Sequence, residues 1–451
     1  MAGITLAQAA AWCGGSVAEQ YQNITFSGAS NDSRTIRPGQ LFVALVGARD
    51  GNAFIPMAFE KGAAAVLTSR SNEDYPAIVV EDPRLALGQI AAALRRQIGM
   101  KVVGVTGSVG KSTTKEMIAA VLEGDYTVSK TPANFNNDLG LPMAILAMEE
   151  DTQVAVLEMG MSHFGEISYL SHIAKPDIGV ITNIGTMHME NLGSREGILR
   201  AKLEICDGMA PEAQLCLFGD DVYLWDCGEK LSHPVHYFGV SNADCHLRAM
   251  NICRQEKGVS FEVQTGDGAF CVNLPLEGMH FVSDALAAIS VGQLLGVPAQ
   301  RMADRLARFR NMAGRQEIFE SKGITIIKDC YNAGPESMAA ALQVLGNRSG
   351  RRIAVLGDML ELGSATEEAH LAAGRMAARC AEYLLTYGPN GQIVGRGAVV
   401  AGMDEAHIFA FQDRKEMAEK LRCICVPGDV LLFKGSHGMH MELVLEHFLQ
   451  N

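Results

Sequence analysis

The stretch Gly104-Val-Thr-Gly-Ser-Val-Gly-Lys-Ser-Thr113 decides how the centre of this chain folds. It overlaps the end of the valine-rich run Lys101–Val105 and continues into a helix-forming segment that reaches about Leu122. A strand, a glycine-rich loop and a helix N-terminus in this order direct backbone N–H groups toward phosphate oxygens. Lys111 then reaches the terminal phosphates, and the Ser112 hydroxyl is available to Mg²⁺. The stretch therefore predicts a site for the phosphates of a nucleotide.

This loop is a variant of the common phosphate-binding (P-loop) pattern. Val105 stands where the strict pattern has Gly, and the additional glycines are Gly104 and Gly107. The Asp-x-x-Gly and Asn-Lys-x-Asp sequences that a GTPase switch protein carries do not occur in the chain. Kinases, motors and ligases remain as classes.

Further candidate residues follow the next two apolar runs. Glu158 ends the run Val154–Leu157, where a phosphate-bound Mg²⁺ would need an oxygen ligand. The run Ile178–Thr182 leads into a polar loop that contains His188, and Lys202 lies on a predicted helix beyond it. Taken singly, such a Glu is more often a surface residue or a helix cap, such a His is mostly structural, and such a Lys is solvent-exposed. These three residues support a metal site only as a group.

The bulk composition narrows the function classes. The 38 basic and 51 acidic residues of the 451-residue chain give a net charge of −13, which argues against a general nucleic-acid binder. No Lys or Arg precedes Arg34, so the N-terminus lacks the positive region of a signal peptide. Asp284 interrupts the most apolar segment, Phe281–Val297, so no membrane span is expected. Eleven irregularly spaced cysteines fit reduced, mostly buried thiols, and we expect a cytoplasmic protein.

The chain is long enough for several domains, and its pattern suggests three. Residues 1–82 contain short apolar runs between turn residues, and residues 83–313 contain the strand–loop–helix signals. Residues 314–451 alternate strands with helices, which predicts a doubly wound sheet that binds ligands at the carboxyl ends of its strands. Ser364 and Asp413 have capping-box spacing and are predicted to open helices. The expected fold is α/β, with a small mixed N-terminal domain, a central doubly wound P-loop domain and a C-terminal Rossmann-like domain.

Together, these segments resemble the Mur ligases over nearly the whole chain. Asn31-Asp-Ser-Arg34, followed by Pro38–Gly47, is similar to the uridine-nucleotide-binding N-terminal domain of this family. The P-loop variant matches the family's form, and residues 181–202 look like the segment that supplies a metal-binding His and a carbamylated Lys. The resemblance implies ATP and two Mg²⁺ ions as cofactors. The implied metal ligands are Ser112, Glu158, His188 and a carbamate on Lys202.

Two stretches indicate one activity within the family. Asn134-Phe-Asn-Asn-Asp-Leu-Gly-Leu-Pro142 and Asp329-Cys-Tyr-Asn-Ala-Gly-Pro-Glu-Ser-Met338 resemble the member that joins D-alanyl-D-alanine to UDP-N-acetylmuramoyl-tripeptide. This resemblance implies that the tripeptide carboxylate is activated as an acyl phosphate, which the dipeptide amine then attacks. The alternative is another Mur-type or folylpolyglutamate-type ligase that adds a single amino acid. Tyr331-Asn-Ala333 speaks against it, because ligases earlier in the pathway typically have Tyr-Ala-His there.

The resemblance also implies roles for individual residues. Those implied in catalysis are Lys111, Glu158, His188 and Lys202. Those implied in nucleotide binding are Gly107, Ser108, Gly110, Lys111, Ser112, Thr113, Asn183, His280, Arg315 and Asp329. Those implied in substrate binding are Ser33, Arg34, Asn134, Asn136, Asn137, Asp138, Tyr331, Asn332, Lys434 and Ser436. Both substrates are small molecules, and we expect a monomer with no nucleic-acid partner.

The sequence departs from the family pattern near some of these residues. Phe281 and Asp284 stand where Asn is usual, which affects the expected adenine and ribose contacts. His437 and His440 stand where Arg is usual, and a neutral imidazole does not replace a guanidinium in bidentate carboxylate binding. Asn52 replaces a common His. None of these positions belongs to the phosphate-binding loop.

Overall fold

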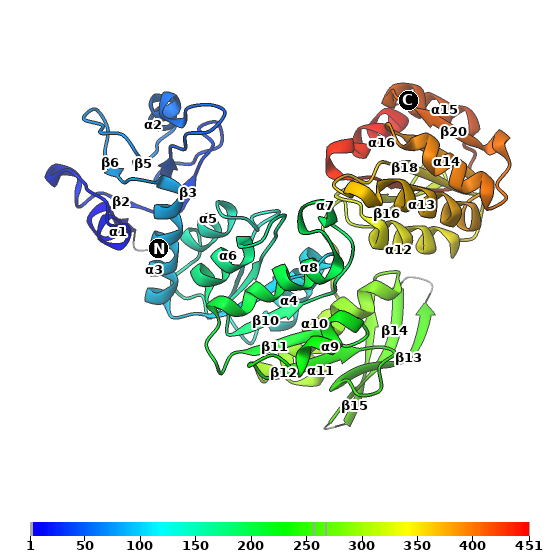
Figure 1. Ribbon diagram of the computed structural model, residues 1–451, viewed down its shortest axis with the longest axis horizontal. Helices are drawn as coiled ribbons and strands as arrows, with labels where there is room; N and C mark the ends of the chain where they lie inside the picture. Colours follow the sequence, from blue (N-terminus) through cyan, green and yellow to red (C-terminus); the bar gives the residue numbers. More distant parts are fainter. Residues whose placement is uncertain (1–2, 256–257, 267, 451) are drawn as a thin grey trace.

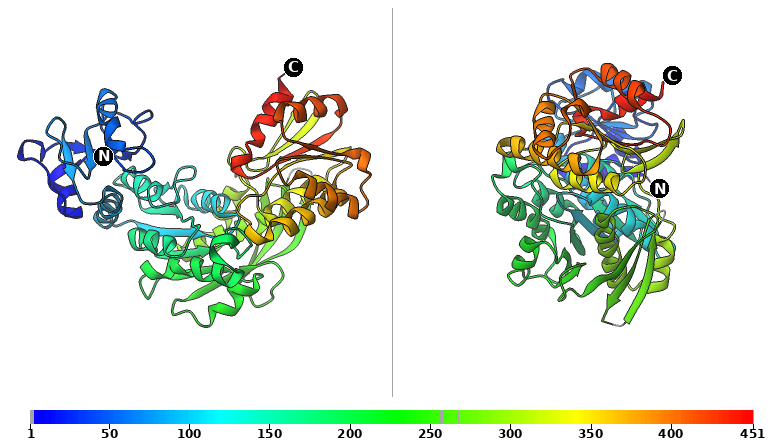
Figure 2. Two further views of the ribbon diagram at one scale, coloured as in Figure 1. Left: turned by 45° about the horizontal axis from the view of Figure 1, so that its top comes forward. Right: turned by 90° about the vertical axis from the view of Figure 1, so that its right-hand side faces the viewer.

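The computed structural model of the protein describes residues 3–255, 258–266 and 268–450. Three α/β domains follow one another along the chain, and the N-terminal and C-terminal domains both stand on the central one (Figure 1). The two outer domains also stand apart in the left-hand view of Figure 2. The expected three-domain α/β fold is therefore confirmed. We keep the limits 1–82, 83–313 and 314–451 as a proposal.

The N-terminal domain is built on a small parallel sheet with the strand order β3-β4-β5-β6. Every residue of β4 and β5 is buried, as expected for continuous apolar strands covered on both faces. The elements of this domain are β1 (Ile4–Thr5), α1 (Leu6–Cys13), η1 (Glu19–Tyr21), β2 (Thr25–Phe26), β3 (Ala29–Ser30), β4 (Leu41–Val43), η2 (Gly51–Phe54), α2 (Ile55–Glu60), β5 (Ala65–Thr68) and β6 (Ala77–Val79).

The helix α3 (Pro83–Ile98) leads from this domain into the central one. The Asp82 side chain caps it by accepting hydrogen bonds from the backbone N–H groups of Arg84 and Leu85. Gly99, in the left-handed conformation at φ 71°, ends it. Because α3 packs against α1 on one side and against α5 (Gly140–Leu146) and α6 (Glu166–Ala174) on the other, it holds the two domains together.

The central domain contains a nine-stranded sheet with the order β15-β14-β13-β12-β11-β10-β7-β9-β8. The strands from β8 to β13 in this order are parallel, as expected for a doubly wound sheet, whereas β14 and β15 are antiparallel to their neighbours. Of the nine strands, β7, β9 and β10 correspond to the apolar runs named from the sequence, and the other six were not predicted individually. The strands are β7 (Lys101–Thr106), β8 (Val128–Lys130), β9 (Val154–Glu158), β10 (Ile178–Ile181), β11 (Gln214–Phe218), β12 (Val235–Gly239), β13 (Leu247–Gln255), β14 (Gly258–Thr265) and β15 (Gly268–Leu274).

Helices cover both faces of this sheet. The apolar segment that sequence analysis singled out forms α10 (Met279–Leu294), which packs against α4 (Lys111–Leu122) in the domain core. Among the described residues, no helix has the length and apolar character needed to cross a membrane. The other helices are α7 (Met189–Leu192), α8 (Arg195–Leu203), η3 (Glu204–Gly208), α9 (Val222–Gly228) and α11 (Ala299–Leu306).

The C-terminal domain has a six-stranded sheet with the order β16-β17-β21-β18-β19-β20, parallel except for the edge strand β16. Helices α12 to α14 cover one face, and α15 and α16 cover the other. The elements are β16 (Glu317–Ser321), β17 (Ile324–Asp329), α12 (Pro335–Gly346), β18 (Arg352–Gly357), η4 (Gly363–Ala365), α13 (Thr366–Cys380), β19 (Tyr383–Tyr387), α14 (Gly391–Val400), η5 (Glu405–His407), β20 (Ile408–Phe411), α15 (Arg414–Ile424), β21 (Val430–Lys434), η6 (His437–Met439) and α16 (Met441–Leu449).

The two predicted helix starts in this domain have different outcomes. Asp413 caps α15 by accepting hydrogen bonds from the backbone of Lys415 and Glu416, which confirms the prediction. Ser364 does not cap α13, and that prediction is wrong, because Ser364 lies within the 3-10 turn η4 and the α-helix begins at Thr366.

Candidate active site

The phosphate-binding loop follows β7 and leads into the first turn of α4. Gly107 (φ 149°) and Gly110 (φ 86°) both adopt backbone conformations that favour glycine. A Cβ atom at Gly107 would lie 1.9 Å from the Thr182 hydroxyl, and one at Gly110 would lie 2.5 Å from Asp284 Oδ1. The two glycines therefore allow the loop to curl tightly against its neighbours before Lys111 begins the helix.

The segment after β10 holds the loop in this shape. The Asn183 side chain accepts a hydrogen bond from the Val109 N–H and donates one to the Val109 carbonyl, both at 3.0 Å. The Thr182 hydroxyl donates to the same carbonyl at 2.6 Å, and the Gly185 N–H donates to Ser108 Oγ at 2.9 Å. Asn183, predicted to contact the nucleotide, thus also positions the loop.

Lys111 lies over the loop from the first position of α4. Its ammonium donates to the carbonyl oxygens of Gly107 at 2.7 Å and Ser108 at 3.2 Å. Burial lowers the pKa of Lys111, while the charge of Glu158 acts to raise it. A buried cation among carbonyl groups at a helix N-terminus is a binding element for a polyanion such as a triphosphate.

Glu158 ends β9, which pairs with the P-loop strand β7 so that Glu158 lies opposite Val105. One oxygen, Oε1, accepts a hydrogen bond from Asn136 Nδ2 at 2.9 Å. The other, Oε2, is buried and has no hydrogen-bond donor among the described residues. The Lys115 ammonium lies 3.8 Å from it and donates instead to the Thr131 carbonyl at 2.7 Å.

His188 and Lys202 lie close enough to Lys111 for its charge to act on both, and His188 shares the wall of one cavity with Glu158. Burial, together with the charges of Lys111 and Lys202, lowers the pKa of His188 to about 4, so its imidazole is neutral at neutral pH. Its Nδ1 lies 3.0 Å from Glu361 Oε2 but makes no aligned hydrogen bond. Lys202 is fully surrounded, burial lowers its pKa well below the usual value, and it forms no ion pair with any described residue.

These donors suit a magnesium ion that is shared with phosphate oxygens. A buried carboxylate oxygen without a donor and a neutral imidazole are ready to act as ligands. Within the described part of the chain, no three His, Cys, Asp or Glu side chains are grouped so that they could hold a metal by themselves. Mg²⁺ usually binds through one or two carboxylates together with substrate phosphates and water, so it does not require such a group.

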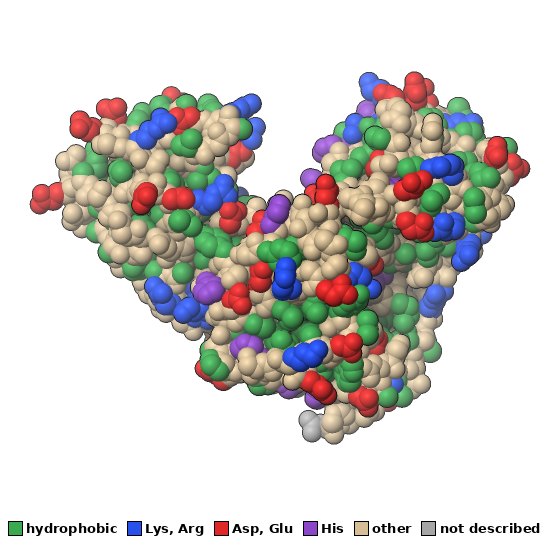
Figure 3. Space-filling view, in the orientation of Figure 1, with side chains coloured by type: hydrophobic (Ala, Val, Ile, Leu, Met, Phe, Trp, Pro, Cys, Tyr) green, Lys and Arg blue, Asp and Glu red, His purple; other side chains and the backbone are tan. Residues whose placement is uncertain are grey.

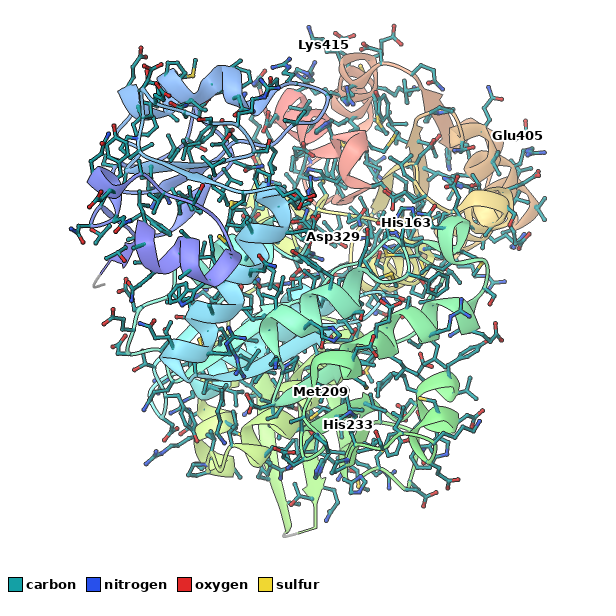
Figure 4. All side chains as sticks on the ribbon, turned by 60° about the vertical axis from the view of Figure 1, so that its left-hand side comes forward. His163, Met209, His233, Asp329, Glu405 and Lys415 are labelled. Atoms are coloured by element: carbon teal, nitrogen blue, oxygen red, sulfur yellow. The ribbon has the colours of Figure 1, made fainter. Side chains whose placement is uncertain are left out.

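The C-terminal domain contributes a second group of charged residues. Lys434, at the end of β21, forms an ion pair of 2.6 Å with Asp329, at the end of the neighbouring strand β17. Arg315 stacks on the Tyr331 ring at 3.9 Å and donates to Ser112 Oγ of the P-loop helix at 2.9 Å. Figure 4 shows Asp329 near the middle of the molecule, whereas Lys415 and Glu405 lie on the outer surface of the same domain. The C-terminal domain thus reaches the phosphate-binding loop directly.

A cavity of about 1220 Å³ joins these groups. It is bordered by the central domain, α3 and the C-terminal domain, and the space-filling view shows the molecule hollowed between its outer domains (Figure 3). Of the predicted site residues, the structure brings the following to the cavity wall: Ser108, Gly110, Lys111, Ser112, Thr113, Asn136, Asn137, Asp138, Glu158, Asn183, His188, His280, Arg315, Asp329, Tyr331, Asn332 and Lys434.

Other predicted residues lie outside this wall. Ser33 and Arg34 are in the N-terminal domain, where the Ser33 hydroxyl contacts Met57 Sδ at 3.3 Å and Arg34 pairs with Asp32 at 2.8 Å. Asn134 is exposed on the loop before α5. The predicted residues outside the wall are Ser33, Arg34, Gly107, Asn134, Lys202 and Ser436.

Lys115, Thr114 and Arg84 form contacts that were not predicted from the sequence. Lys115 is completely buried beside Glu158, and its place four residues after Lys111 on the same helix was the one available signal. Thr114 donates from α4 to Asp284 on α10 at 3.0 Å, and Arg84 pairs with Asp138. No spacing rule connects these last two pairs, because their partners lie far apart in the chain.

The departure at Asp284 leads to a prediction about stability. Burial raises the pKa of Asp284 to about 7 from 3.8, so the folded protein binds a proton that the unfolded chain releases between these values. Stability therefore falls as the pH rises from about 4 to about 7, at about 1.4 kcal/mol for each pKa unit. Asp284→Asn removes this loss. The melting temperature of the variant minus that of wild type should therefore be larger at about pH 8 than at about pH 5. The exposed Asp244→Asn is the control, and an equal difference at both pH values would contradict the prediction.

Comparison with known proteins agrees with this geometry. Residues 105–292 match the Mur ligase middle domain, and residues 314–437 match the domain described as Mur ligase, glutamate ligase domain. A UDP-N-acetylmuramoyl-tripeptide–D-alanyl-D-alanine ligase from Bacillus subtilis (strain 168) is 39% identical over 444 residues, covering 96% of this chain and 95% of the relative. MurF from Acinetobacter baumannii superposes with a TM-score of 0.90 at 31% identity, over 100% and 99% of the two chains. MurF from Thermotoga maritima, in complex with ADP, superposes at 0.84 and 30% identity, over 94% and 97%.

The chain belongs to the Mur ligase family. Within that family, the chain matches ligases named for UDP-N-acetylmuramoyl-tripeptide and D-alanyl-D-alanine over nearly their whole length.

Proposed function

We propose that the chain is the ATP-dependent ligase that forms an amide bond between UDP-N-acetylmuramoyl-tripeptide and D-alanyl-D-alanine, a step of peptidoglycan synthesis. The observation that carries this proposal is one cavity lined by the P-loop, by Glu158 and by the Asp329–Lys434 pair. Because the central and C-terminal domains both border it, ATP and the reacting ends of two further substrates can meet there at the terminal phosphate. The end-to-end match to relatives of this name favours it over a ligase that adds a single amino acid.

The reaction proceeds in two steps. The tripeptide carboxylate attacks the γ-phosphate of ATP and gives an acyl phosphate and ADP. The dipeptide amine then attacks the acyl carbon, and phosphate leaves. Both steps depend on positioning and on neutralising oxygens that carry negative charge.

Individual residues of the cavity meet these needs. Lys111 and the N-terminus of α4 neutralise the ATP phosphates, and Arg315 brings a second cation from the C-terminal domain. Lys434, fixed by Asp329, places a buried ammonium where the C-terminal domain borders the cavity. Closure of the C-terminal domain over the reacting groups would exclude water, which would otherwise hydrolyse the acyl phosphate.

Ser112, Glu158 and His188 would hold Mg²⁺, and Lys202 would join them as a carbamate. The ions would supply positive charge to the phosphate oxygens. A carbamate on Lys202 would turn a buried amine that has no ionic partner among the described residues into an oxygen donor, which is the kind of ligand that Mg²⁺ prefers. The proposal further includes a monomer that acts in the cytoplasm.

The test is to incubate the protein with ATP, Mg²⁺, UDP-N-acetylmuramoyl-tripeptide and either D-alanyl-D-alanine or single amino acids. We expect phosphate release only with the dipeptide, together with a product in mass spectrometry that contains the tripeptide extended by two alanines. Release with a single amino acid alone would favour the alternative ligase.

A further inference from the structure

An ion pair between two helical regions lines the cavity next to α3. Arg84 lies in the first turn of α3 and pairs with Asp138 on the loop before α5. The two side chains remain 46% and 38% exposed, and both line the cavity. The pair therefore keeps a positive and a negative group accessible to a ligand.

The surroundings of this pair are those of a binding site for a long side chain. The Tyr169 hydroxyl is buried beside it and has no hydrogen-bond partner among the described residues. It lies against Gly88 of α3, where a Cβ atom would come within 2.3 Å of the hydroxyl oxygen. Leu85 and Phe164 line the same cavity and are 51% and 39% exposed, so they present apolar surface. The loop that carries Phe164 also carries His163, which is labelled in Figure 4.

The pair also lies close to the reacting groups. Asn136 donates to Glu158 Oε1 at 2.9 Å, and its carbonyl accepts a hydrogen bond from the Gly160 N–H at 2.7 Å. Asp138 follows only two residues later on the same loop. A substrate residue whose carboxylate reaches Glu158 and the P-loop can therefore extend its side chain to Arg84 and Asp138.

We propose that Arg84 and Asp138 bind the side-chain end of the third tripeptide residue and select a diamino dicarboxylic acid over lysine. The end of such a residue, as in 2,6-diaminopimelate, carries a carboxylate for Arg84 and an ammonium for Asp138. The Tyr169 hydroxyl donates to the carboxylate, and the methylene groups lie on Leu85 and Phe164. A lysine side chain offers only the ammonium and leaves the ligand-facing part of Arg84 without a partner. This inference rests on the proposed function.

The first test uses the wild-type protein. UDP-N-acetylmuramoyl-tripeptides that end in meso-diaminopimelate or in L-lysine are each supplied with ATP, Mg²⁺ and D-alanyl-D-alanine. We expect kcat/KM, measured by phosphate release, to be about 10- to 100-fold higher for the diaminopimelate substrate, the effect of one charge-assisted hydrogen-bonded pair. Equal values, or a preference for lysine, would overturn the inference. Release with neither substrate would instead contradict the proposed function.

The second test assigns the preference to the ion pair. Arg84→Met keeps the aliphatic stem and removes the charge, and the ratio of the two kcat/KM values should fall to about 1. Asp138→Asn should lower kcat/KM for both tripeptides, because both carry the ammonium. Arg96→Met, which removes an exposed cation further along α3 and outside the cavity wall, should keep the wild-type ratio. If Arg84→Met lowers both values equally, the pair only braces α3 against the loop and the inference fails.

Discussion

Lys111→Ala is expected to abolish ligation, with kcat lowered by at least about 1000-fold, the range found when a preorganised charge on a transferring phosphoryl group is removed. The ammonium of Lys111 lies over the P-loop, bound to the Gly107 and Ser108 carbonyls, and alanine leaves these groups without it. Calorimetry with ATP and Mg²⁺ should also show weaker binding. Phosphate release in the presence of all substrates measures the loss.

The matched control is Lys101→Ala, at the opposite end of the strand that carries the loop. Lys101 is exposed, and its replacement changes the net charge by the same amount. Its kcat should stay within about twofold of wild type, as for most surface substitutions. Near-normal turnover in Lys111→Ala would contradict the assignment of the phosphate site to this loop. It would also contradict the proposed mechanism, which depends on that site.

Lys202→Ala is expected to lower kcat by more than about 100-fold, and added bicarbonate should not restore it. The amine is completely buried near His188 and Lys111 and pairs with no carboxylate among the described residues. Alanine removes the group that would carry the carbamate. ATP binding should be largely retained, which separates this variant from Lys111→Ala.

Labelled bicarbonate provides the second measurement for Lys202. Wild type should give a carbamate resonance by NMR that is missing in Lys202→Ala and present in Lys230→Ala, where an exposed lysine is removed. A high-resolution crystal structure with an unmodified Lys202 far from Mg²⁺ would contradict the carbamate.

The features that could be predicted from the sequence are those that depend on residues close together in the chain. Buried parallel strands appear as short apolar runs, and β9 has the bounds expected for it, with Glu158 at its end. The P-loop is equally local, since glycine, lysine and the following helix are consecutive in the chain. The carboxyl ends of parallel strands meet at one edge, so Glu158 was expected beside the loop. Asn183 was expected at the nucleotide only because the family resemblance implies it.

What could not be predicted depends on contacts between distant segments. Asp284 is 170 residues from Thr114, and Arg84 is 54 residues from Asp138, so no periodicity connects them. The antiparallel strands β14 and β15 extend one end of the sheet, and their burial patterns are irregular. Only the folded domain shows which strand they join. Ser364 has the spacing of a capping residue, but it lies in a 3-10 turn that precedes the α-helix in the chain.

The hydrogen bond from Arg315 to Ser112 has a consequence for how the protein responds to ATP. A nucleotide bound with Mg²⁺ on the Ser112 hydroxyl would compete with this hydrogen bond for the oxygen, so its affinity would depend on the position of the C-terminal domain. Linkage is reciprocal. Nucleotide binding would therefore change the equilibrium between positions of the C-terminal domain by the same free energy by which the domain position changes the nucleotide affinity. The Arg315 guanidinium would thereby couple nucleotide binding in the loop to the position of the C-terminal domain. A substitution that changes one of these would also change the other.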